Sequence, residues 1–313
     1  MIADRLDIAP EVTAALRDGR PVVALESTLI SHGLPYPENL EVARASEAAV
    51  RDRGAIPATV AIHDGRLLVG LDQGALESLA TAPPGSVRKA ARPTLAAVLA
   101  GGWAATTVSA TMIAAHAAGI QVFATGGIGG VHSGALGGPD ARGGRASFDI
   151  SSDLEELART PMAVVCAGPK AILDVAATLE YLETRGVPVI VLGQEEVPGF
   201  YSRSSGLAAP LSVPDIGGAA QLVATHLDLG LGTGILICVP PPEDTALPPD
   251  VARKAIEQAT AEAALAGILG PAVTPWLLTR IGQITAGASV RANTALIVND
   301  ARVAAELAVR LIP

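Results

Sequence analysis

The sequence predicts an α/β protein with a mostly parallel sheet that is covered by helices on both faces. Short apolar runs rich in Val, Ile and Ala alternate with longer helical patterns along the 313 residues. These runs are continuous, as in strands that are buried on both sides of a parallel sheet. No repeat of fixed period and no linker interrupts the pattern, so we expect a single domain over residues 1–313.

The expected elements follow one another in strand–helix order. We expect strands over residues 21–28, 58–71, 106–111, 121–127, 162–168, 187–193 and 234–240. We expect helices over residues 37–53, 94–102, 112–119, 152–160, 171–186, 216–229, 249–267 and 293–309. The polar, glycine-rich stretch from Ser133 to Arg145 is predicted to be a mobile loop.

Composition narrows the class of partner. The formal net charge is −9 and no basic cluster occurs, which argues against binding to nucleic-acid polymers and favours a small ligand. We expect no membrane span and no secretory signal, and therefore a cytoplasmic protein. Cys166 and Cys238 lie in apolar strand-like runs, where buried reduced thiols are the ordinary occupants.

Lysine is rare in this chain. Of 22 basic residues only Lys89, Lys170 and Lys254 are lysine, and the others are arginine. Arginine stays protonated, whereas lysine can lose its proton and attack carbon, so the lysines are candidates for chemistry that needs an amine. Lys254 lies in a helical surface pattern and is interpreted as an ordinary surface charge.

Polar residues that directly follow apolar runs are the best site candidates, because ligands bind beyond the carboxyl ends of parallel strands. Glu26 follows such a run and is a candidate general acid, although a capping or salt-bridging role would explain it equally well. The run from Thr125 to His132 contains four glycines whose backbone amides could approach an anion. It lacks the dinucleotide fingerprint, so NAD is rejected.

Asp149 and Asp153 are four residues apart, a spacing that would place both carboxylates on one face at a helix start. Such oxygen ligands suit Mg²⁺ or Mn²⁺. Helix capping by Ser151 or Ser152, with Asp153 in the first turn, is the competing interpretation.

Lys170 follows an apolar run, and we expect it one turn into a helix, where the positive end of the helix dipole would disfavour an additional cation and favour a reactive amine. Lys89, within a short basic stretch, could supply the positive charge that a phosphate needs, or could belong to a solvated basic face.

With these residues assembled, the chain resembles the pseudouridine-5′-phosphate glycosidase (pseudouridylate synthase) family over nearly its whole length. The segments that carry the resemblance are VALESTLISHGLPYPENLEVA, GAIPATVAI, ATTVSATMIAAHAAGIQVFATGGIGGVH, SFDISSDLEELA, VVCAGPKAILD and TLEYLETRGVPVIVLG. The resemblance implies an α/β/α layered fold, a homotrimer, bound Mn²⁺, and reversible conversion of pseudouridine 5′-phosphate and water into uracil and ribose 5-phosphate.

Matched position by position, the resemblance implies that Glu26 is the proton donor, Lys170 the covalent nucleophile and Asp149 the metal ligand. It implies substrate contacts at Lys89, Thr107, Val108, Ser151, Ser152, Asp153 and Asn293. The chain departs from the family in its longer glycine-rich loop and in lacking an acidic residue after Lys89. Two alternatives remain: a Schiff-base lyase or synthase acting on another sugar phosphate, and a non-catalytic nucleotide-binding module.

Overall fold

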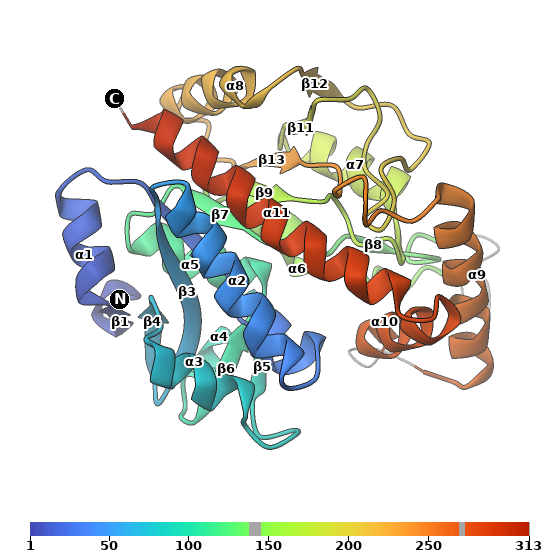
Figure 1. Ribbon diagram of the computed structural model, residues 1–313, viewed down its shortest axis with the longest axis horizontal. Helices are drawn as coiled ribbons and strands as arrows, with labels where there is room; N and C mark the ends of the chain where they lie inside the picture. Colours follow the sequence, from blue (N-terminus) through green and yellow to red (C-terminus); the bar gives the residue numbers. More distant parts are fainter. Residues whose placement is uncertain (138–144, 269–272, 313) are drawn as a thin grey trace.

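The computed structural model describes residues 1–137, 145–268 and 273–312. Its main sheet is mostly parallel and has helices on both faces, which confirms the predicted fold class (Figure 1). Among the described residues the strand order is β1-β4-β3-β2-β7-β9-β13-β11-β12, with β6 paired to β3 and β5 paired to β6. The strands are β1 (Leu6–Ile8), β2 (Val22–Leu25), β3 (Ile56–His63), β4 (Arg66–Val69), β5 (Arg88–Ala90), β6 (Trp103–Thr106), β7 (Val122–Ala124), β9 (Ala163–Cys166), β11 (Val189–Leu192), β12 (Leu211–Val213) and β13 (Ile235–Cys238).

Helices cover both faces of this sheet. In Figure 1, α2, α8 and α11 lie in front of the sheet, and α5, α6 and α7 lie behind it. The helices are α1 (Pro10–Arg17), α2 (Glu38–Asp52), α3 (Gln73–Ala80), α4 (Leu95–Val98), α5 (Val108–Ala117), α6 (Ser152–Leu157), α7 (Val175–Thr184), α8 (Ile216–Asp228), α9 (Pro249–Leu265), α10 (Val273–Ile284) and α11 (Ala288–Leu311), with short turns η1 (Ala3–Arg5), η2 (Leu29–Gly33) and η3 (Arg92–Thr94).

Two of the predicted strands differ from the structure. The run over residues 58–71 is an antiparallel hairpin of β3 and β4, because Asp64 and Gly65 adopt positive φ angles of 42° and 79° and reverse the chain. The run over residues 106–111 belongs mainly to α5, with the preceding strand β6 ending at Thr106. The Thr and Val residues of this run favour a strand locally. In the structure Val108 is instead the first residue of a helix, and its side chain is buried in the core.

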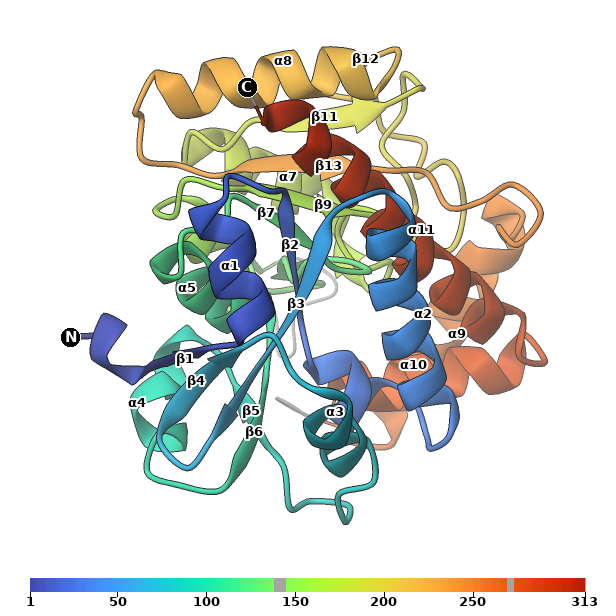
Figure 2. The same ribbon diagram turned by 60° about the vertical axis from the view of Figure 1, so that its left-hand side comes forward.

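The long helix α11 crosses the front of the sheet in Figure 1 and packs against α2, β2, β7 and β9. Figure 2 shows it lying beside α2. It begins after Gly287, whose φ of 81° suits glycine, and it extends beyond the predicted 293–309 at both ends. The preceding helix α10 was not predicted. It packs against α9, and the two helices lie beside the first turns of α11.

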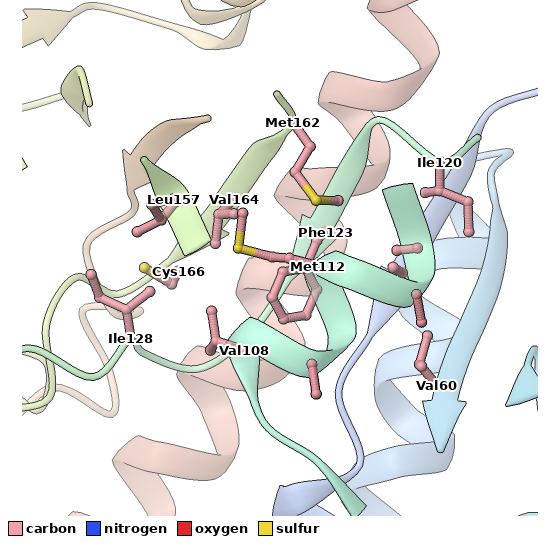
Figure 3. Packing of buried hydrophobic residues seen from close by; sticks show 14 of the residues in the cluster. Val60, Val108, Met112, Ile120, Phe123, Ile128, Leu157, Met162, Val164 and Cys166 are labelled. Carbon is pink, nitrogen blue, oxygen red and sulfur yellow. The ribbon is translucent and has the colours of Figure 1, made fainter. Parts of the chain in front are cut away.

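The core behind the sheet is built from aliphatic and sulfur-containing side chains around one aromatic ring. Phe123 from β7 is fully buried, and Met112 and Met162 lie around it (Figure 3). Cys166 and Cys238 are both free and buried, as predicted. Within the described ranges, no helix combines the length and apolar character needed to cross a membrane.

Candidate active site

The site is assembled at one edge of the sheet, where three neighbouring parallel strands end. Strand β7 lies between β2 and β9, and Ala124 is the register partner of both Leu25 and Val165. Glu26 directly follows β2, Thr125 directly follows β7, and Lys170 comes four residues after β9. Residues that are far apart in sequence therefore meet at the same edge, as expected for carboxyl ends of parallel strands.

A pocket opens at this edge and brings together four of the predicted site residues: Glu26, Lys89, Lys170 and Asn293. The glycine run contributes Gly126 and Gly127, and helices α10 and α11 supply part of the wall. The remaining lining residues are Leu25, Thr28, Leu29, Ile30, His32, Gly33, Ala43, Ser46, Thr59, Ala124, Thr125, Phe200, Thr274, Pro275, Leu278 and Ile297.

Glu26 has the environment of a proton donor. Burial raises the pKa of its carboxyl above the ordinary value; the Lys170 charge and the Thr125 hydroxyl oppose the rise without cancelling it. The Thr125 hydroxyl donates a hydrogen bond to Oε1 of Glu26. Because β2 and β7 are paired, this bond fixes the carboxyl against the neighbouring strand end.

The prediction that Lys170 lies within a helix was wrong. Lys170 lies in the turn between β9 and β10 (Leu173–Asp174), and α7 begins only at Val175, capped by the Asp174 side chain. The helix-dipole argument for a reactive amine therefore does not apply. The turn is instead held by its backbone: Lys170 N donates to the Ile128 carbonyl at 3.1 Å, and the Leu173 amide donates to the Lys170 carbonyl at 3.0 Å.

Lys89 comes from a different part of the sheet, strand β5, and its side chain opens into the pocket. The pKa of its amine is lowered, mainly because its surroundings are partly desolvated and secondly because Lys170 places a like charge nearby. Two amines and one carboxyl thus share the pocket. Such an arrangement of charges is chemically suited to binding an anion and to holding an amine close to an acid.

The other predicted substrate contacts form a second, adjoining group outside the pocket lining. Asp153 is buried: its Oδ1 accepts the Ser109 amide at 3.0 Å and its Oδ2 accepts the Gly129 amide at 2.9 Å. The Asp153 charge acts to raise the pKa of both Glu26 and Lys89, so Asp153 lies near both of these pocket residues. Asp153 thereby ties the glycine run to the start of α5.

Hydroxyl groups complete this second group. Thr107 is the N-cap residue of α5, and its side chain lies 3.2 Å from the Ser109 hydroxyl, which in turn lies 3.1 Å from that of Ser152. Ser151 caps α6 by accepting the Asp153 amide, as the capping interpretation predicted. The Val108 side chain is buried in the core, so its backbone is the part able to meet a ligand.

Asp149 does not share a helix face with Asp153, which corrects the spacing argument. Helix α6 begins at Ser152, so Asp149 lies before it in an exposed segment, where its carbonyl accepts the His132 amide at 3.1 Å. Among the described residues no three His, Cys, Asp or Glu side chains gather to hold a metal. A single exposed carboxylate suits only a hard ion that keeps most of its water ligands, so Mn²⁺ stays a prediction.

Sequence analysis missed several residues of the pocket. Thr125 was placed in the glycine run, but its contact with Glu26 depends on strand pairing. His32 also lines the pocket and was not among the predicted site residues. Burial, and secondly the Lys89 charge, lower the pKa of its imidazole. Phe200 lines the pocket from a segment without predicted structure, and its φ of 63° is rare for a bulky residue. Most of the predicted loop from Ser133 to Arg145 lies outside the described residues.

Comparison with known proteins identifies the family. The family model described as indigoidine synthase A-like protein matches residues 11–310. The chain belongs to this family. A pseudouridine-5′-phosphate glycosidase from Paracoccus denitrificans is 54% identical over 302 residues, which is 96% of each chain. A protein of the same name from Caldanaerobacter subterraneus subsp. tengcongensis is 54% identical and covers 98% of this chain and 96% of its own.

A solved structure agrees with this assignment. The prealnumycin C-glycosynthase AlnA, crystallised with ribulose 5-phosphate, superimposes with a TM-score of 0.86 at 37% identity, covering 98% of this chain and 96% of its own. The resemblance to the pseudouridine-5′-phosphate glycosidase family that the sequence indicated is confirmed, and the chain is an enzyme.

Proposed function

We propose that this enzyme reversibly cleaves the C–C glycosidic bond of pseudouridine 5′-phosphate, giving uracil and ribose 5-phosphate, and that residues 1–313 form one domain for this reaction. The observation that carries the proposal is the convergence of Glu26, Lys89 and Lys170 on one pocket. The names of the 54% identical relatives and the sugar phosphate bound by the C-glycosynthase support the substrate class.

The chemistry explains why a lysine is needed. A carbon-linked base cannot leave by protonation of a glycosidic nitrogen, so an electron sink is required at C1′. In the proposed route Glu26 protonates the ring oxygen, the C1′–O4′ bond breaks, and the neutral amine of Lys170 bonds to C1′. Glu26 is half-buried and its pKa is raised, which favours the protonated form that this step requires.

The second half of the route releases the base. The secondary ammonium formed by the attack loses one proton, and C5 of uracil gains one as the C1′–C5 bond breaks. The freed nitrogen lone pair of Lys170 then forms an iminium with C1′. Water then adds to C1′, and the amine departs to leave the aldehyde form of ribose 5-phosphate. Arginine could not replace Lys170 in this role, because it does not give up its proton.

Substrate binding is assigned to the groups around the amine. Lys89 is proposed to hold the 5′-phosphate, with further contacts from the Thr107 and Val108 backbone, from Ser151 to Asp153, and from Asn293. We propose that Asp149 holds a mostly hydrated Mn²⁺, which would supply positive charge near the phosphate. We also propose a cytoplasmic homotrimer, as the resemblance implies.

The decisive experiment mixes the purified enzyme with uracil and ribose 5-phosphate and measures formation of pseudouridine 5′-phosphate by mass spectrometry. A second candidate, a synthase that joins a different partner to a pentose phosphate, is favoured by the 37% identical C-glycosynthase. Trapping of ribose 5-phosphate on the enzyme without any uracil-dependent product would favour that alternative over the glycosidase.

A further inference from the structure

Phe200, in the loop between β11 and β12, is a pocket residue that the proposed mechanism does not use. Its side chain is 2% exposed and lines the pocket. Its backbone φ of 63° is unfavourable for a residue with a bulky side chain. A conformation of this kind persists where the surroundings fix it, and such residues are concentrated at ligand sites. Glycine would adopt this φ without strain, so the phenyl ring needs a reason to be retained.

Packing against two neighbours fixes the position of the Phe200 ring. The ring lies against the backbone of Gly127, because a Cβ atom on that glycine would be 2.6 Å from Cε2 and 2.9 Å from Cδ2 of the ring. Phe200 also meets Tyr201 edge to face, with ring centroids 4.8 Å apart. The Tyr201 carbonyl accepts the Leu247 amide at 2.8 Å, which ties the loop to the segment before α9. The ring is therefore held in one place in the pocket wall.

This ring lies beside the segment that carries Lys170. The glycine run and this segment continue the pairing of β7 with β9: the Ile128 amide donates to the Gly168 carbonyl at 3.2 Å, and the Lys170 amide donates to the Ile128 carbonyl at 3.1 Å. The Gly168 carbonyl oxygen would be 3.0 Å from the same Cβ atom on Gly127 that the ring approaches. The phenyl ring and Lys170 therefore occupy neighbouring parts of the pocket wall.

Chemistry indicates which part of the substrate this wall would meet. The phosphate is assigned to Lys89, and ribose hydroxyl groups need polar partners that a phenyl ring does not offer. The base is bonded to C1′, the atom to which the Lys170 amine bonds in the proposed route, so the base must lie close to that amine. A planar unsaturated base packs well against the edge or the face of an aromatic ring. Phe200 is the only phenylalanine, tyrosine or tryptophan that the described part of the chain places in the pocket lining.

We propose that Phe200 is a specificity-determining residue for the base: its ring, packed against Gly127, forms the apolar wall on which a planar pyrimidine rests while Lys170 holds the sugar. This inference rests on the proposed function and deepens it, because it assigns base binding to a residue that sequence reasoning did not identify. It predicts that base binding and sugar-phosphate binding can be changed separately.

Phe200→Leu keeps an apolar side chain but removes the aromatic ring. In the condensation of uracil with ribose 5-phosphate, we expect the KM for uracil to rise about three- to tenfold. The KM for ribose 5-phosphate and the rate of borohydride trapping on Lys170 should stay within about twofold of the parent, because neither involves the base.

Phe123→Leu is the matched control, since it makes the same change at a fully buried ring outside the pocket lining. It should lower the thermal unfolding midpoint without changing these kinetic constants. An unchanged uracil KM in folded Phe200→Leu would overturn the proposal. An equal rise in the KM for ribose 5-phosphate, or an equal rise of the uracil KM in Phe123→Leu, would overturn it as well, because either indicates a general loss of packing.

The parent enzyme provides a test that does not require Phe200→Leu to fold. Borohydride-trapped enzyme holds the sugar phosphate on a reduced amine, so calorimetric titration with a base measures binding without turnover; enzyme that does not trap is titrated with ribose 5-phosphate present. Dihydrouracil has the carbonyl and N–H groups of uracil on a puckered, saturated ring. It should bind the parent at least about threefold more weakly than uracil, and Phe200→Leu should narrow this difference. Equal binding of the two compounds to the parent would overturn the proposed wall.

The same titrations distinguish failure of this inference from failure of the proposed function. If the parent traps ribose 5-phosphate but makes no uracil product, the glycosidase function fails, whereas weaker uracil binding in trapped Phe200→Leu would still support the base wall. If the product forms and Phe200→Leu binds uracil as the parent does, the wall fails and the function stands. A parent that shows no uracil binding and makes no product would overturn both.

Discussion

Two acidic regions of this enzyme looked alike in sequence but differ in structure. Glu26 follows a strand, and strand pairing brings it beside Thr125 and into the pocket that contains Lys170. Asp149 and Asp153 were paired by spacing alone, yet one is exposed and the other is buried with both oxygens bonded to backbone amides. Register between parallel strands is thus a better guide to a shared site than local spacing when the helix start is unknown.

The largest loss of activity is expected when the amine of Lys170, at the strand-end site, is replaced. Lys170→Arg keeps the charge but cannot form an iminium, so we expect kcat to fall by at least about 10³-fold with an unchanged fold. Borohydride with ribose 5-phosphate should leave a mass adduct on the Lys170 peptide of the parent. Lys254→Arg, on the exposed face of α9, should behave as the parent. Substantial activity in Lys170→Arg, or trapping on Lys89 instead, would contradict the assignment.

Metal removal tests the exposed acid of the second region. If Asp149 holds Mn²⁺, chelation should reduce turnover by about 10³-fold or more, since a bound metal supplies several kcal/mol of charge stabilisation. Mn²⁺ should restore activity better than Ca²⁺, which prefers more and longer ligand bonds. Full activity after exhaustive chelation would remove the metal from the reaction and leave Asp149 without its proposed role.

The acid at the strand end should show its role in a pH profile. If Glu26 is the proton donor, it must be protonated to act, so the rate should be highest below its raised pKa and fall as pH rises through that value. Glu26→Gln should lower kcat by about 10²- to 10³-fold and abolish this limb. Glu47→Gln, which changes a buried carboxyl on α2 bonded to Thr59 at 2.6 Å, is the control. A high-pH limb that persists in Glu26→Gln would assign it to another group.

The smallest effect is expected for the phosphate contact. If Lys89 holds the 5′-phosphate, Lys89→Ala removes a charge-assisted bond worth about 1.5–3 kcal/mol, so KM should rise by about 10- to 100-fold with little change in kcat. Steady-state kinetics with phosphorylated and unphosphorylated pseudouridine measure both values. If the parent enzyme uses the two substrates equally well, Lys89 does not bind the phosphate.

The sequence by itself determined the α/β class, the buried thiols and the candidates Glu26, Lys89 and Lys170. Continuous apolar runs indicate buried parallel strands, and polar residues at the ends of such runs indicate the ligand-binding edge. Only three lysines occur in the chain, so composition alone could single out the amines.

The tertiary structure decided what depends on contacts between distant segments. Local propensity placed Lys170 in a helix and residues 106–111 in a strand, but packing moved the start of α7 to Val175 and placed the latter segment mainly in α5. The Thr125 bond to Glu26 exists because β2 and β7 pair, and Ile297 lines the pocket because α11 packs against β2, β7 and β9. Neither contact can be predicted from the spacing of residues in the sequence, because both depend on how remote segments pack.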